Sequence, residues 1–163
     1  MAQAAGAKSY GEISIGAYGY GVLPAGGGTV SPTLAYSQPW TWNGVNGSGG
    51  TITSGATVAY SGSGVDAATG TVSAATKGTT ESGQTTVATA TVSVSLNGKS
   101  AAKEAVVFQE ANSATYGNVT PKNITVADIP ASGGTISEGT LATDFTQTIS
   151  YTSGATRPGA VTY

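Results

Sequence analysis

The side chains that could do chemistry in this chain are few and far apart. The sequence contains no histidine, which removes Ser-His-Asp triads, histidine general acids and imidazole metal ligands together. Its eight carboxylates are dispersed, at Glu12, Asp66, Glu81, Glu104, Glu110, Asp128, Glu138 and Asp144. Nothing in their flanks indicates a pair held within the roughly 5–10 Å that glycoside hydrolysis needs, or the closely spaced acids of a calcium loop. We therefore predict that the protein is not an enzyme, with no catalytic, cofactor-binding or metal-binding residues and no cofactor.

Composition also limits the partners. The chain has no cysteine, so neither a disulfide framework nor a thiolate metal site can form, and packing must supply the stability. Its six Lys and Arg residues are scattered and the formal net charge is −2, which gives no basic field for phosphates. No apolar run reaches the length of a membrane span, and the N-terminus lacks the basic and apolar regions of a secretory signal. We expect no nucleic-acid partner, no membrane partner and no standard secretion route.

The elements that would position a functional residue are organised as an internal repeat. The run Pro24–Ser31 (PAGGGTVS) returns 106 residues later (130 − 24) as Pro130–Ser137 (PASGGTIS), and the same offset carries Tyr10-Gly11 onto Tyr116-Gly117. A period near one hundred residues is the size of a small β-sandwich. The predicted parts are an N-terminal arm at residues 1–9, a complete module at residues 10–113 and the first half of a second module at residues 114–163.

Alternation of apolar and polar residues predicts that these modules are all-β. The clearest strand spans residues 87–96, with Ala and Val or Leu on one face and Thr and Ser on the other. Asn97-Gly98 is typical of a hairpin turn, and residues 105–109 return as its partner. Glycines at positions 16, 19 and 21 predict that the first strand is split in two. We predict one core wall, formed by Val92, Val94, Leu96, Val106 and Phe108.

The second module is predicted to stop halfway. Its expected core residues and strand are Ile124, Val126, Ile129, Leu141, Phe145 and the run Thr148 to Tyr151. Half a sandwich leaves an apolar face and unpaired edges uncovered. Either the natural chain continues or another chain completes the sheet.

Two groups of residues are candidates for binding. Trp40 and Trp42 share a face of one heavy strand, and two interpretations fit them: bulky core residues, or a platform on which sugar rings stack. The arm supplies the second group, Ala4, Ala5 and Lys8, together with Tyr10. Its small residues fit either a frayed terminus or a docking arm that approaches the backbone of a neighbouring subunit closely.

The corner motif and the closing run Val106–Ala111 (VVFQEA) resemble the immunoglobulin-like modules of Bacteroidetes and their phages, of the BACON type. The resemblance covers residues 10–113 as a full module and residues 114–163 as a partial one, and it implies tandem immunoglobulin-like β-sandwich modules. Related modules serve surface glycan enzymes, adhesins, and the fibres or capsid decorations of gut phages, including the crAss-like group. They carry no catalytic residues.

The resemblance implies a non-enzymatic structural protein of a phage virion, a head fibre or capsid decoration attached through its N-terminal part. Such a protein is assembled in the cytosol and needs neither a signal peptide nor disulfides. The implied partners are capsid or other virion proteins and further copies of the chain, taken as a trimer from the fibre resemblance. The alternative is an extracellular or bacterial cell-surface module for adhesion or carbohydrate binding, whose partner is a host surface glycan. An accessory domain of an enzyme is the third class.

Overall fold

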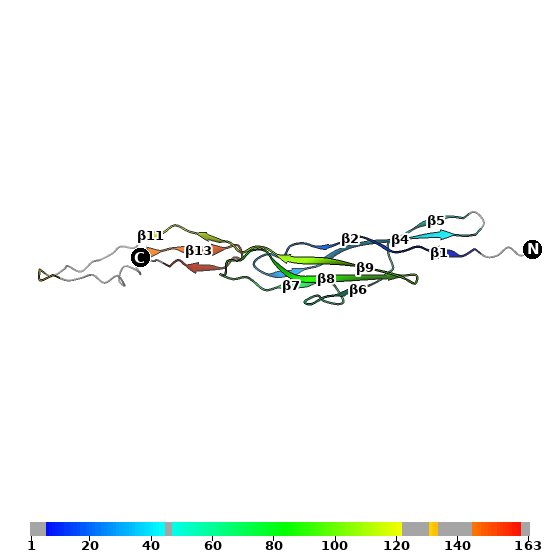
Figure 1. The fold of residues 1–163 in the computed structure, drawn as a ribbon. Coiled ribbons are helices and arrows are strands. Elements are labelled where there is room, and N and C mark those ends of the chain that lie inside the picture. Colours follow the sequence, from blue (N-terminus) through cyan, green and yellow to red (C-terminus); the bar gives the residue numbers. More distant parts are fainter. Residues whose placement is uncertain (1–5, 45–46, 122–130, 134–144, 161–163) are drawn as a thin grey trace, which may run out of the picture.

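The computed structural model describes residues 6–44, 47–121, 131–133 and 145–160. All regular structure in these ranges is β-strand, so the predicted all-β class is confirmed (Figure 1). The expected core residues Ile124, Val126, Ile129 and Leu141 lie outside the described residues. The strands are β1 (Lys8–Tyr10), β2 (Ser14–Tyr20), β3 (Gly28–Val30), β4 (Pro32–Trp42), β5 (Gly49–Ile52), β6 (Thr57–Ser61), β7 (Val72–Ala74), β8 (Thr85–Leu96), β9 (Lys99–Gln109), β10 (Ala114–Tyr116), β11 (Thr120–Pro121), β12 (Phe145–Thr146), β13 (Thr148–Tyr151) and β14 (Thr156–Pro158).

Strands β1–β9 form the first unit, whose core lies between two groups of strands. One group pairs β2 with β4 and β3 with β7, and the other has the order β6-β8-β9. The larger core cluster joins Ile13 and Tyr18, beside or within β2, to three buried residues of β8. A second cluster contains Leu23, which also makes a parallel bridge to Gln109 at the end of β9. Segment 21–24 therefore leaves the β2–β4 pair and joins the other group.

The β8–β9 hairpin follows from its sequence. Ala88, Ala90, Val92 and Val94 are all buried, whereas Thr and Ser fill most of the opposite face, as the alternation predicts. The turn residues Asn97 and Gly98 have φ values of 49° and 75°, the left-handed pair that a two-residue hairpin turn requires.

The predicted orientation of β9 was wrong. Val106 and Phe108 are 45% and 38% exposed, whereas Val107 between them is fully buried. The register explains this, because Val107 lies opposite Ala88 and so shares the inward face of β8. The apolar run 105–108 carries no alternation of its own, and only its pairing with β8 settles which residues point inward. The predicted core wall holds for the two β8 valines, and Leu96 packs partly buried against the same cluster.

The repeated corner behaves as its glycines predict. The N–H of Gly27 donates to the Pro24 carbonyl at 3.0 Å, and Gly27 has φ of 84°. A Cβ there would lie 2.8 Å from the Ala74 carbonyl oxygen, so glycine meets both a conformational and a steric demand. In the second copy of the corner, Gly133 has φ of 87°.

The split of the first strand falls earlier than the glycines at 16, 19 and 21 suggested. Both β1 and β2 pair with β4, and residues 11–13 separate them. Gly16 instead sits at an irregularity in the register between Ile15 and Ala17. Lys8 and Ser9 of the expected arm belong to β1, so this part of the arm lies along β4 of the same chain.

The second unit, β10–β14, repeats the start of the first in register. β10 pairs with β13 as β1 pairs with β4, and β14 lies on the other side of β13 as β5 does on β4. The pair Ser14↔Ser37 returns as Thr120↔Thr146, offset by 106 residues on one strand (120 − 14) and 109 on the other (146 − 37). The internal repeat read from the sequence is therefore also a repeat of strand pairing.

Three polar side chains are buried among the described residues, and all three are amides: Gln38, Gln109 and Asn112. Gln109 donates to the carbonyls of Pro24 and Ala75 at 3.1 and 2.8 Å, which closes the end of the first unit that faces the second. Asn112 donates to Gly78 and Thr80 at 3.0 and 2.8 Å. Buried amides with full sets of partners fix one geometry, because any shift leaves polar atoms unpaired.

We expect Val107→Ala to lower the free energy of unfolding by about 2 kcal/mol, because it removes buried methyl groups and leaves a cavity. The matched variant Val106→Ala should cost about 0.5 kcal/mol or less, because that side chain faces solvent. Urea denaturation followed by tryptophan fluorescence measures both. Equal losses, or a larger loss for Val106→Ala, would contradict the orientation of β9.

Candidate functional site

The candidate residues of the sequence come together at one end of the molecule. Strands β1 and β5 flank the second half of β4, and this three-stranded piece, here called the end sheet, projects beyond the first unit's core on the side opposite the second unit (Figure 1). Lys8 pairs with Trp42 and Tyr10 with Trp40. Because directly opposite residues share a face, these four side chains lie on one face of the end sheet. Ala4 and Ala5 lie outside the described residues.

The two tryptophans are half-buried and belong to neither hydrophobic core cluster of the described residues. Glycines lie against their rings: a Cβ at Gly50 would be 2.9 Å from Trp40 Nε1, and one at Gly6 would be 2.6 Å from Trp42 Cε2. The Lys8 Nζ lies 4.6 Å from the centroid of the Trp40 ring, a cation–π contact worth roughly 0.5–1 kcal/mol at an exposed site. The indoles therefore lie against backbone and a cation, outside the core between the strand groups.

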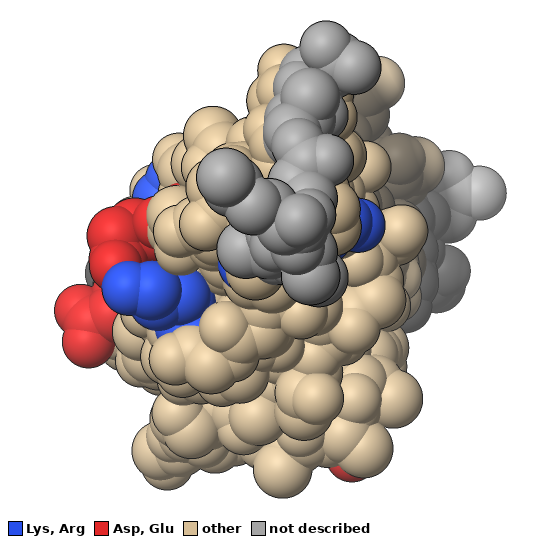
Figure 2. All heavy atoms as spheres, turned by 90° about the vertical axis from the view of Figure 1, so that its right-hand side faces the viewer, with Lys and Arg blue, Asp and Glu red and all other residues tan. Residues whose placement is uncertain are grey.

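A hollow of about 200 Å³ adjoins Trp40 and is lined by Ser9, Tyr10, Gly11, Pro39, Trp40 and Thr41. Figure 2 looks onto this end and shows most of its described surface free of charged side chains, with most of the charges gathered on one side. An aromatic and hydroxyl lining without charge suits contact with a neutral polar surface, such as a polypeptide or a sugar.

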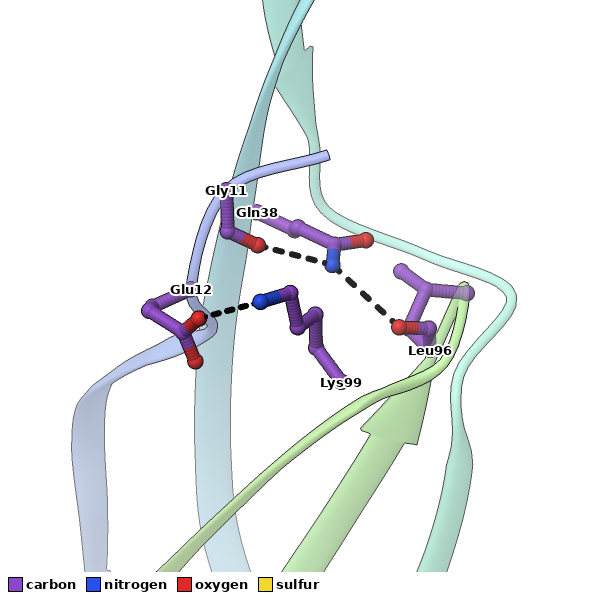
Figure 3. A network of polar contacts seen from close by, with 5 residues as sticks. All are labelled: Gly11, Glu12, Gln38, Leu96 and Lys99. Carbon is purple, nitrogen blue, oxygen red and sulfur yellow. Dashed lines mark hydrogen bonds and ion pairs between the residues drawn. The ribbon is translucent and has the colours of Figure 1, made fainter. Parts of the chain in front are cut away.

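Gln38 holds the end sheet on the rest of the unit (Figure 3). Its fully buried amide donates to the Gly11 carbonyl at 3.0 Å and to the Leu96 carbonyl at 3.2 Å, and its oxygen accepts from the Asn97 side chain at 3.0 Å. One side chain thus joins the break between β1 and β2 to the β8–β9 hairpin. The neighbouring ion pair of Lys99 with Glu12 adds little, because Glu12 is 76% exposed.

Sequence reasoning placed Gln38 on the heavy face of its strand but assigned it no role. The available signal was a polar residue at a core-facing position that the repeat preserves. Gln147, 109 residues later (147 − 38), donates to the Gly117 carbonyl at 2.9 Å, as Gln38 does to Gly11. A glutamine at the same place in both units indicates a structural requirement for its amide.

The titratable groups with shifted pKa values serve the fold. Burial, together with a hydrogen bond to Tyr20, raises the pKa of the Tyr18 phenol, and burial also raises the pKa of Tyr60. The backbone N–H of Thr69 leads the contacts that lower the pKa of Asp66, whose carboxylate caps a surface turn. Within the described ranges, no group of three or more His, Cys, Asp and Glu side chains is arranged to hold a metal ion.

The same part of the chain contains no helix long and apolar enough to cross a membrane.

Comparison of the chain with protein-family models, with curated proteins and with solved structures found no match. The end sheet and the repeat are therefore the features from which a function is argued.

We expect Gln38→Met to lower the free energy of unfolding of the first unit by about 2–4 kcal/mol, because the Gly11 and Leu96 carbonyls lose their donor. Gln147→Met is the matched control: its side chain is half-buried and donates one such bond, so about 1 kcal/mol or less is expected. Urea denaturation reports on the first unit, since both tryptophans lie there. Equal midpoints for the two variants would contradict the role given to Gln38.

Proposed function

We propose that strands β1–β9 form an immunoglobulin-like β-sandwich module and that β10–β14 begin a second one. The support is the path of the chain: β2 pairs with β4, and segment 21–24 then crosses to lie parallel to β9. A first strand that serves both sheets, followed by a three-stranded sheet β6-β8-β9, fits this architecture.

We further propose that the protein is a non-enzymatic structural component of a phage virion, a head fibre or capsid decoration, located in the virion. The observation that carries this proposal is the end-to-end arrangement of two in-register units with a hydrogen-bonded joint between them (Figure 1). Repeating units along one axis suit a projecting protein. The end sheet, at the far end from the second unit, is the proposed attachment point to capsid or other virion proteins, and a homotrimer is the proposed assembly.

An epitope-tagged chain supplied during phage infection should co-purify with virions in a density gradient. Removal of residues 1–9, which takes Lys8 and Ser9 from β1, should reduce incorporation by about tenfold, since attachment would lose several contacts. Removal of residues 1–5 alone separates the arm from the strand, and circular dichroism checks that both variants fold. Unchanged incorporation of both would contradict N-terminal attachment, and native protein found on bacterial surfaces but not on particles would contradict the virion proposal.

The alternative proposal is a bacterial cell-surface module for adhesion or carbohydrate binding, with a host surface glycan as partner. The specific observation that favours it is the half-exposed pair Trp40 and Trp42 on one face beside Tyr10, since sugar rings stack on such faces.

A glycan array probed with the full chain tests this alternative. A bound glycan should lose at least about tenfold in affinity with Trp40→Ala and Trp42→Ala, given the stabilisation typical of aromatic contacts. Val22→Ala is the control, because Val22 is an exposed apolar residue outside the end sheet. An empty array, or equal losses in all three variants, would count against glycan binding.

A further inference from the structure

The joint between the two units is built from a small set of polar contacts. The turn after β13 places Ser153 against the end of the first unit, where its N–H donates to Asn112 Oδ1 at 2.9 Å and its hydroxyl to the Gly78 carbonyl at 2.6 Å. The N–H of Ala114, the first residue of β10, donates to the Glu81 carboxylate at 3.2 Å. The second unit is thus held through its β13–β14 turn and the start of β10.

The end sheet of the first unit repeats the surface that makes this joint. In the second unit, Ser113 and Thr152 exchange hydrogen bonds: the Ser113 N–H donates to the Thr152 hydroxyl at 3.3 Å, and the Thr152 N–H to the Ser113 carbonyl at 3.1 Å. In the first unit, Ala7 and Asn43 exchange the same two bonds, at 2.7 and 3.2 Å. The offsets are again 106 (113 − 7) and 109 (152 − 43). The backbone of both ends therefore has the same arrangement, and Gly44 stands where Ser153 stands.

The two ends differ in burial. Ile149 and Tyr151 of the second unit are 3% and 6% exposed, whereas their equivalents Trp40 and Trp42 are only half-buried. The end sheet thus presents larger aromatic side chains with more of their surface open. It has the hydrogen-bonding pattern of a joint surface and an apolar area that is still uncovered.

We propose that the end sheet is a joint surface whose occupant is the end of a like β-unit joined directly before β1 in the chain direction. The occupant presents what residues 78–82 and 109–112 present here: turn carbonyls, a carboxylate, and an asparagine amide that accepts the Gly44 N–H. This inference concerns how units join and does not depend on the proposed virion role.

Two observations identify this occupant. The residues before β1, Gln3–Gly6 (QAAG), match Gln109–Asn112 (QEAN) at Gln and Ala with the 106-residue offset, so the chain leading into β1 has the residue types that end a unit. Lys8 stands where Ala114 meets the Glu81 carboxylate, so it places a positive charge where an equivalent carboxylate would come. The match and the charge both favour a unit that ends as the first unit does.

The test inserts a second copy of residues 7–112 between Gly6 and Ala7 of the full chain, so that an Asn112 precedes Ala7 as it precedes Ser113. The inserted copy carries Trp40→Phe and Trp42→Phe, which leaves the original tryptophans as reporters and gives the two copies distinguishable peptides. Peptide-resolved hydrogen exchange should show the original Gly44 amide slowed about tenfold relative to the unaltered chain, since it gains a hydrogen bond at a closed joint. Acrylamide quenching of Trp40 and Trp42 should fall at the same time.

The matched control is Asn112→Ala in the inserted copy alone. It should return Gly44 exchange to the rate of the unaltered chain, while Ser153 stays protected by the original Asn112. Unchanged Gly44 exchange and quenching in a molecule whose Ser153 amide is protected would overturn the proposal. Gly44 protection in the unaltered chain that rises with protein concentration would make a second copy the occupant and would overturn it as well.

Discussion

A buried amide must find a partner for each of its polar atoms, and this one constraint shapes both ends of the first unit. Gln38 meets it by joining the break after β1 to the β8–β9 hairpin, and Gln109 and Asn112 meet it at the opposite end. Losing any of these partners would strand a desolvated polar group, at a cost of about 1–3 kcal/mol. The apolar cores hold the strand groups together, whereas the amides determine where strands break, turn and meet the next unit.

Local pattern was enough to predict the elements whose geometry is local. The alternation in β8, the Asn97-Gly98 turn and the glycine corner at Gly27 all depend on neighbouring residues, and the structure has them as expected. The inward face of β9 depends on its register with a distant bulge between Thr86 and Ala88, which an apolar run without alternation does not encode.

The candidate site was predictable as residues but not as a place. Lys8 and Trp42 were singled out for unrelated reasons, docking and sugar stacking, and a cross-strand pair over a sequence distance of 34 residues (42 − 8) brings them together. The amides were harder to predict, because a glutamine in an alternating strand has no special signal until its partners are known. The repeat supplied that signal, since Gln147 occupies the matching place in the second unit. Periodicity at the scale of a unit thus carried information about contacts that periodicity within a strand did not.

The parallel contact between segment 21–24 and β9 has a mechanical consequence. Leu23 donates to the Phe108 carbonyl and accepts from the Glu110 N–H, both at 2.8 Å, so a segment from the start of the unit is bonded alongside the strand that leads out of it. Tension applied along the long axis of the molecule would pull these two segments in opposite directions along their length. Bonds in that geometry share the load and must break together, whereas bonds at a peeled edge break one after another. The first unit is therefore built to transmit tension along its axis.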